Sequence, residues 1–224
     1  MALILSLETS TGVCSVALHD NEKLLADREI HVPQSHSSKL AVLVEEVIRE
    51  AGRSMKELNA VAIASGPGSY TGLRIGTSMA KGLCYSLNVP LIAIGTLDVM
   101  AFQVSGINDK RSLLCPMIDA RRMEVYCKVF DADLMVRQEV GARIIDEHSF
   151  SDFLVSEKIL FFGDGASKCR ELIRHENAFF VDDIYPSASQ LGLLAFSKLK
   201  AGLTEDVVHF EPFYLKDFLI KKAV

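Results

Sequence analysis

The chain alternates between short apolar runs, which are typical of strands, and longer stretches in which apolar residues recur at helical spacing. The first three apolar runs are separated by polar turns, which predicts an antiparallel meander. The following stretch ends at Gly52, a residue suited to the left-handed position after a helix. The predicted elements of the first half are strands near 3–7, 13–18, 23–30, 60–64 and 91–94, and helices from Ser35 or Ser37 to Gly52, from 73 to 87, and after an N-cap at Thr96.

The second half of the chain repeats the plan of the first in constant register. Each half has a strand, an acidic residue, a short turn and a second strand, so that Glu8 corresponds to Asp119. The interruption at 107–111 separates the repeats and predicts an N-terminal lobe, 1–106, and a smaller C-terminal lobe, 107–224. We therefore expect two related α/β lobes that meet at a cleft, each with a mixed sheet and flanking helices, and a last helix that packs back toward the N-terminal lobe.

Composition places the chain among globular proteins that bury a full core, with 49% hydrophobic and 24% charged residues in a length of 224. The net charge of −5 argues against a chain that grips nucleic acid alone. No uninterrupted apolar run reaches the length of about 18 residues that a membrane-spanning helix needs. The five cysteines form no CxxC pair, which favours a reduced, cytoplasmic protein.

The loop between the predicted strand 60–64 and the helix that follows is the strongest local signal. Glycines let a backbone approach a ligand closely, and the first amides of a helix can hold an anion. The loop does not match the Walker A pattern, and a tight turn without a ligand explains the same glycines. Its residues are Gly66, Pro67, Gly68, Ser69, Tyr70, Thr71 and Gly72.

The polar turns that follow the first strand of each lobe are further candidates for a ligand-binding site. Carboxylates and hydroxyls at such turns can hold a metal or face phosphate, and an ordinary polar turn explains them equally. Asp119-Ala120-Arg121-Arg122 is either a functional acid–base turn or a salt-bridged hairpin. His31 and His36 have no clear third ligand nearby, so they predict no metal site, and no nucleophile signature is present.

Small residues follow one stripe of the predicted helix 73–87. Gly72, Gly76 and Ala80 recur every four positions, which lets another backbone approach closely. The neighbour is either the sheet of the same lobe or a helix of another subunit.

Seven runs along the chain share the pattern of one known family: Leu7–Thr11, Gly66–Gly76, Ala80–Leu83, Asp119–Arg122, Gly163–Ala166, Tyr185–Ala188 and Pro212–Lys216. Together these runs resemble the bacterial TsaB family, also called YeaZ. The resemblance implies the two-lobed actin/Hsp70/sugar-kinase (ASKHA-like) fold and a role in installing threonylcarbamoyl on adenosine 37 of tRNAs that read codons beginning with A. In that family TsaB is the non-catalytic paralogue of the transferase TsaD. It pairs with TsaD through helices of the N-terminal lobe, is joined by the ATPase TsaE, and forms a homodimer when alone.

The resemblance also implies which residues act. It implies no catalytic residue, no metal, no required cofactor, no membrane contact, and tRNA contact only through the complex. A degenerate cleft that allows weak ATP or ADP binding would comprise Glu8, Thr9, Ser10, Thr11, Asp119, Gly163 and Gly165. The partner interface would comprise Leu40, Leu43, Val47, Gly72, Arg74, Gly76, Met79, Ala80 and Leu83.

The sequence departs from the enzymatic members of the superfamily at two positions. The transferase holds its metal with an HxxxH pair, where this chain has His36 and Leu40. Glu8 stands where nucleotide-binding relatives carry Asp. The alternative function is a nucleotide-binding ATPase or phosphotransferase of the same superfamily, and the glycoprotease label given to such proteins finds no support in the residues.

Overall fold

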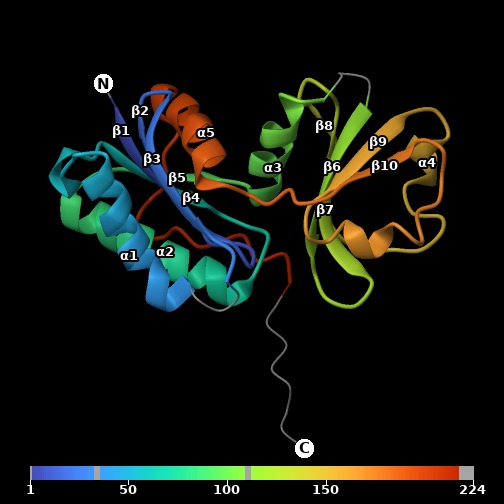
Figure 1. The fold of residues 1–224 in the computed structure, drawn as a ribbon, viewed down its shortest axis with the longest axis horizontal. Coiled ribbons are helices and arrows are strands. Elements are labelled where there is room, and N and C mark those ends of the chain that lie inside the picture. The colour runs from blue at the N-terminus through green and yellow to red at the C-terminus, as the bar shows by residue number, and fades with distance from the viewer. Residues whose placement is uncertain (1, 33–35, 109–111, 217–224) are drawn as a thin grey trace, which may run out of the picture.

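The computed structural model describes residues 2–32, 36–108 and 112–216, which form two α/β lobes side by side (Figure 1). Among these residues each lobe contains one five-stranded sheet. The first sheet has the order β3-β2-β1-β4-β5. Its strands are β1 (Leu3–Glu8), β2 (Cys14–Asp20), β3 (Lys23–Ile30), β4 (Ala60–Ala64) and β5 (Leu91–Ile94).

The first three strands are antiparallel, and β4 and β5 join them in parallel to β1. Alternating side chains of β1 point to opposite faces of this sheet. Leu5 packs in the core under α1 (His36–Glu50) and α2 (Tyr70–Leu87), and Ile4 packs in the core under α5 (Ala188–Lys200). Helices therefore cover both faces of the first sheet (Figure 1).

The second sheet repeats the strand order of the first. Its order is β10-β9-β6-β7-β8, so that β6 occupies the place of β1 and β7 the place of β2. The strands are β6 (Ser112–Asp119), β7 (Glu124–Phe130), β8 (Val136–Ile144), β9 (Lys158–Phe162) and β10 (Ala178–Val181). The predicted two-lobed, mixed-sheet α/β fold is confirmed, and Glu8 and Asp119 end equivalent strands.

The helices of the second lobe are much reduced. The segment between β8 and β9 holds only α4 (Ser151–Leu154), where the first lobe has the long helix α1. Short 3-10 helices lie at Met55–Glu57 and Ser167–Cys169. The helix α3 (Thr96–Ser105) packs against β6 and β7 although it precedes residue 107, and α5 packs on the first sheet although it follows the second. Each lobe thus borrows a helix from the other half of the sequence.

A segment without regular structure, which we call the C-terminal strap (residues 203–216), runs back across the first lobe. Lys81 on α2 donates to the carbonyls of Val208 (2.9 Å) and Phe210 (3.0 Å). The Phe213 amide donates to the Ser65 carbonyl at 2.7 Å. At its far end Lys216 forms an ion pair with Glu124 on β7, so the strap ties the two lobes together.

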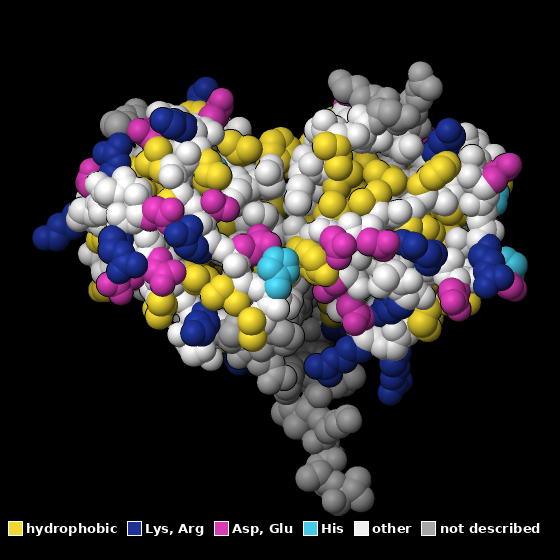
Figure 2. All heavy atoms as spheres, in the orientation of Figure 1, with side chains coloured by type: hydrophobic (Ala, Val, Ile, Leu, Met, Phe, Trp, Pro, Cys, Tyr) yellow, Lys and Arg dark blue, Asp and Glu magenta, His cyan; other side chains and the backbone are white. Residues whose placement is uncertain are grey.

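Charged side chains of both signs are interspersed over both lobes on the face shown in Figure 2, and apolar side chains gather on the second lobe beside the hollow between the lobes. No helix in the described residues is long and apolar enough to span a bilayer.

Candidate functional site

The turn after β1 is closed to solvent. Glu8, Thr9 and Ser10 are fully buried, and Thr11 is 5% exposed. The Glu8 Oε1 accepts hydrogen bonds from the Ser10 amide (2.6 Å) and the Ser10 hydroxyl (2.5 Å), while Oε2 has no partner in the described chain. Burial raises the pKa of Glu8 to about 7 from its ordinary value of 4.5. The carboxyl is thus turned onto its own loop rather than offered to a ligand.

The glycine-rich loop covers this turn directly. The Ser69 amide donates to the Ser10 carbonyl at 2.6 Å, and the Thr9 hydroxyl donates to the Gly72 carbonyl at 2.8 Å. A Cβ added to Gly68 would lie 2.2 Å from the Ser10 carbonyl oxygen, and one on Gly72 would lie 2.1 Å from that of Thr9. These two glycines are therefore required because the chain approaches itself, as in the tight-turn alternative.

The helix α2 begins earlier than its apolar pattern predicts. It starts at Tyr70, so the last part of the predicted loop, Tyr70 to Gly72, is the first turn of the helix. Ser69 is the N-cap, and its hydroxyl accepts from the Gly72 amide at 3.3 Å. The loop proper is Ser65 to Ser69, and Gly66 in it has a φ of +109°.

The small-residue stripe of α2 packs against its own sheet, which corrects its assignment to a partner helix. A Cβ on Gly76 would lie 2.2 Å from the Thr9 Oγ1 and 2.9 Å from the Ile63 Cδ1. Gly72 is buried over the same turn, and Ala80 is fully buried in the core. The stripe lets α2 lie close to β1 and β4, and it offers no surface to another chain.

The remaining residues of the predicted partner interface fall into an accessible group and a buried group. Arg74 is exposed and Met79 and Leu83 are half-buried, so these three are accessible on α2. Leu40, Leu43 and Val47 on α1 are at most 3% exposed and belong to the core, so their assignment to a partner interface is also corrected. The apolar spacing that identified α1 as a helix marks its inward face.

Two accessible apolar side chains on these helices were missed by the sequence interpretation. Val42 on α1 is 47% exposed, and Tyr85 on α2 is 82% exposed. In the sequence, both residues could have been recognised as apolar positions that do not belong to the inward-facing stripe of their helix. At the start of α2, the Arg74 guanidinium lies 4.8 Å from the centre of the Tyr70 ring, and the Tyr70 and Tyr214 ring centres are 4.9 Å apart.

In the second lobe the equivalent turn is open. Asp119 is exposed, accepts from the Arg121 amide at 2.8 Å, and forms an ion pair with Lys168. A Cβ on Gly163 would lie 2.3 Å from the Met117 carbonyl oxygen, and one on Gly165 would lie 2.8 Å from the Ile118 carbonyl carbon. These glycines also serve close packing within their own lobe.

The candidate acids are each held within their own lobe, Glu8 by Ser10 and Asp119 by Lys168. His36 donates from Nε2 to the Val13 carbonyl at 3.2 Å, and Leu40 lies in the core. No three His, Cys, Asp or Glu side chains in the part of the chain that the structure describes are placed to hold a metal ion.

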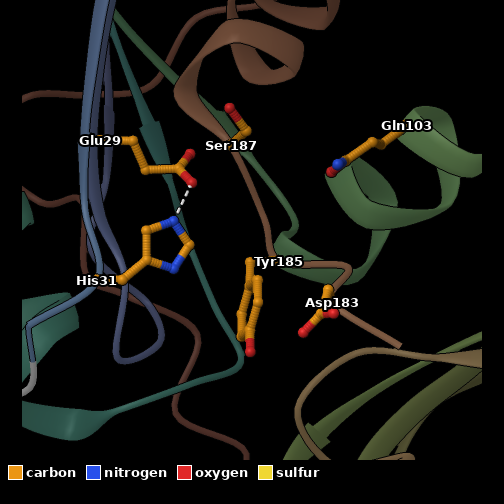
Figure 3. A pocket seen from close by; sticks show the side chains of 6 residues that line it. All are labelled: Glu29, His31, Gln103, Asp183, Tyr185 and Ser187. Atoms are coloured by element: carbon orange, nitrogen blue, oxygen red, sulfur yellow. Dashed lines mark hydrogen bonds and ion pairs between the residues drawn. The ribbon is translucent and has the colours of Figure 1, made fainter. Parts of the chain in front are cut away.

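A polar cavity of about 380 Å³ lies where β3, α3 and the segment before α5 meet (Figure 3). His31 pairs with Glu29 at 2.5 Å, and its ring meets the Tyr185 ring edge-on at 5.4 Å. The hydroxyl of Ser187 points away from the His31 ring and caps α5 by accepting from the Ser189 amide. The lining residues are Glu29, His31, Gln103, Asp183, Tyr185 and Ser187.

The sequence interpretation did not find this cavity, because its walls come from distant parts of the chain. Two carboxylates and a fully buried, unpartnered Gln103 Oε1 make it rich in acceptors. Such a lining disfavours the phosphates of a nucleotide. A second cavity of about 250 Å³ includes Gly66, Pro67 and the ion pair between Lys128 and Asp98 at 2.8 Å.

Comparison with known proteins agrees with the motifs. The family profile described as "TsaD: tRNA N6-adenosine threonylcarbamoyltransferase" matches residues 29–224. The "tRNA threonylcarbamoyladenosine biosynthesis protein TsaB" of Escherichia coli K12 is 31% identical over 96% of this chain and 94% of its own length. A Pseudomonas aeruginosa structure described as uncharacterized "with similarity to peptidase YEAZ" covers 96% of this chain and 100% of its own, with a TM-score of 0.85 and 24% identity.

More distant structures show the fold alone. The activator of 2-hydroxyisocaproyl-CoA dehydratase from Clostridium difficile, with bound ADPNP, has a TM-score of 0.52 at 10% identity and covers 90% of this chain and 96% of its own. The predicted ASKHA-like fold class is therefore confirmed. The chain belongs to the TsaB (YeaZ) family of tRNA threonylcarbamoyladenosine biosynthesis proteins.

Proposed function

We propose that this chain is the non-catalytic subunit of a complex that installs threonylcarbamoyl on adenosine 37 of tRNAs reading ANN codons. It pairs with a TsaD-like transferase, is joined by a TsaE-like ATPase, forms a homodimer when alone, and acts in the cytoplasm where these tRNAs are made. The chain requires no cofactor of its own. The naming of its relatives and the fold support the pathway, and the geometry of the first lobe supports the accessory role.

The observation that carries the accessory role is the closed turn after β1. In a nucleotide-binding lobe this turn must face phosphate, but here its backbone is covered by Ser69, Gly68 and Gly72 of the same chain. Burial raises the pKa of Glu8 to about 7, so at neutral pH its charge is only partly present where a phosphate-bound metal would need it. This arrangement disfavours the alternative of an ATPase or phosphotransferase and leaves at most weak ATP or ADP binding.

A peptidase activity receives no support from the side chains that could supply a nucleophile. All five cysteines are buried, and burial raises the pKa of the Cys14, Cys84 and Cys169 thiols to about 11, far from a reactive thiolate. A hydrogen bond with Cys115 lowers the pKa of Cys127, but this side chain is fully buried and out of reach of a substrate. In the cavity shown in Figure 3, His31 pairs with Glu29, and the hydroxyl of the nearby Ser187 points away from the His31 ring.

The pairing surface that we propose is the outer face of α1 and α2. The two helices lie side by side over the first sheet (Figure 1), and their exposed side chains include Val42, Arg74 and Tyr85. Exposed aromatic and arginine side chains are the residue types that most often dominate interface energy. The buried stripe of α2 supports this surface from below by fixing the helix on the sheet.

The experiment measures threonylcarbamoyl transfer to tRNA by the chain alone, by TsaD with TsaE, and by all three proteins. We expect no product from the chain alone and strong stimulation in the three-protein mixture. Product from this chain alone would overturn the non-catalytic assignment. A mixture with no stimulation would overturn the accessory role.

A further inference from the structure

The turn between β6 and β7 carries two exposed arginines where the equivalent turn of the first lobe carries small, buried hydroxyl residues. By the internal repeat, Ser10 and Thr11 correspond to Arg121 and Arg122. The first pair is buried under the start of α2, whereas both arginines are exposed. In place of a long helix the second lobe has only the 3-10 helix Ser167–Cys169, which leaves this turn uncovered.

Both arginines adopt the left-handed backbone conformation. Their φ values are +70° and +50°, in a region where side chains with a Cβ are disfavoured and glycine or asparagine is the usual occupant. Strained backbone of this kind persists at functional sites, where surrounding contacts hold it in place. A hairpin that needed only to connect two strands would be more stable with glycine at these positions.

The contacts that hold the turn come from Lys168. Its ammonium donates to the carbonyls of Arg122 and Glu124, each at 2.7 Å, and pairs with the Asp119 carboxylate. The turn is also closed by the Glu124 amide, which donates to the Arg121 carbonyl at 3.2 Å. The backbone is thus fixed from beneath, and the two arginine side chains project from a rigid support.

The charges around the turn leave the arginines uncompensated. The neighbouring carboxylates have other partners: Asp119 pairs with Lys168, Glu124 pairs with Lys216 of the strap, and Asp164 accepts from the Asp119 amide at 3.0 Å. The guanidinium groups of Arg121 and Arg122 have no partner of their own among the residues that the structure describes. In a chain of net charge −5, the four cations at this turn outnumber its three carboxylates, which leaves a local surplus of positive charge.

We propose that the Arg121–Arg122 turn is a phosphate-binding contact that engages the backbone of the tRNA substrate when this chain is part of the modification complex. The inference rests on the proposed function, which supplies tRNA as the polyanion present. Guanidinium groups match the geometry of phosphate oxygens, and their charge is never lost at physiological pH. Two such contacts add to the affinity of a complex and do not suffice for RNA binding by an acidic chain alone, which agrees with its composition.

The test measures tRNA binding by the complete complex, reconstituted with wild-type chain or with R121A/R122A, over a series of salt concentrations. We expect the double variant to bind tRNA about tenfold more weakly at low salt. We also expect the slope of log affinity against log salt to decrease by about 1.4 to 1.8, the value for two lost phosphate contacts. The variant R121G/R122G relieves the backbone strain and should lose the same affinity, since it lacks the same side chains.

The matched control is R137A/R170A. It removes two arginines from the same lobe, each of which is already paired with an acid, Glu157 or Asp182. This variant should retain both the wild-type affinity and the wild-type salt slope.

Three results would overturn the proposal. These are an unchanged salt slope in R121A/R122A, retained RNA affinity in R121G/R122G, and weakened assembly with the protein partners in the absence of tRNA, which would make the turn a protein contact. Stimulation of tRNA modification by the wild-type chain is measured in parallel. If the wild-type chain stimulates modification and the R121A/R122A variant binds tRNA normally, only the phosphate contact is refuted. If the wild-type chain fails to stimulate modification, the proposed function itself is refuted.

Discussion

The buried carboxyl of Glu8 makes the stability of this protein depend on pH in an unusual direction. Its pKa is raised to about 7 in the folded chain because burial disfavours the charged form more than the two hydrogen bonds from Ser10 favour it. The negative charge of Glu29 adds to the effect. The unfolded chain exposes the same carboxyl, which then titrates near its ordinary value of 4.5.

The sign follows from which state binds the proton more tightly. Because the folded pKa is the higher one, the contribution of Glu8 is fully present below pH 4.5 and is lost as the pH rises through 7. Each unit of pKa difference corresponds to about 1.4 kcal/mol, so the full loss is about 3 kcal/mol. About 2.5 kcal/mol of this loss falls between pH 5 and pH 8.

The variant Glu8→Gln isolates this effect, because the amide oxygen can still accept both Ser10 hydrogen bonds while no charge forms. Urea unfolding of both proteins at pH 5 and pH 8 should show the wild type losing about 2.5 kcal/mol more than the variant. In thermal unfolding the same difference corresponds to roughly 5–10 °C. Asp164, whose pKa burial raises, and His19, whose pKa burial lowers, titrate in both proteins and cancel in the comparison. Parallel pH profiles for the two proteins would refute the reasoning.

Three further predictions concern α2 and the strap. Gly76→Ala should destabilise the fold by about 1–3 kcal/mol, because the new Cβ would overpack against the sheet. Gly82→Ala should stabilise the helix by about 1 kcal/mol, because nothing lies within 4 Å of the new Cβ. Thermal unfolding of both variants measures the two effects, and equal shifts in melting temperature would contradict the prediction. Tyr85→Ala should weaken homodimer and partner association by at least about tenfold with an unchanged melting temperature, as measured by calorimetry and light scattering. Lys81→Met removes two hydrogen bonds to the strap, so amide exchange in 203–216 should accelerate while exchange in β4 stays slow.

The sequence supported a correct prediction of the two-lobed fold because the strands of each lobe are short, apolar and bounded by polar turns. The register of the repeat placed Glu8 and Asp119 at equivalent strand ends, as the structure shows. The boundary at residue 107 stays a prediction. What local patterns could not supply is the packing of α3 on the second sheet, because the apolar stripe of this helix is the same whichever sheet it covers.

The site was harder to predict than the fold for a related physical reason. A stripe of small residues shows that some backbone comes close, but the stripe itself is the same whether that backbone belongs to the chain or to a partner. Only the close approach of Gly76 to Thr9, where an added Cβ would lie 2.2 Å from the threonine Oγ1, resolves the choice in favour of the chain's own sheet. The cavity at His31 and Tyr185 is built from three separate segments and leaves no local signature in the sequence.

The exchange of helices between the lobes has a consequence for biosynthesis. One face of the first sheet, around Ile4 and Ile92, is covered by α5, which the ribosome makes only after every strand of the second lobe. During synthesis this face remains exposed to water and to chaperones for most of the time that the nascent chain is growing. The N-terminal lobe therefore cannot complete its folding until α5 has been made, whereas every strand of the second lobe, and the helix α3 that packs on it, precedes α5 in the chain.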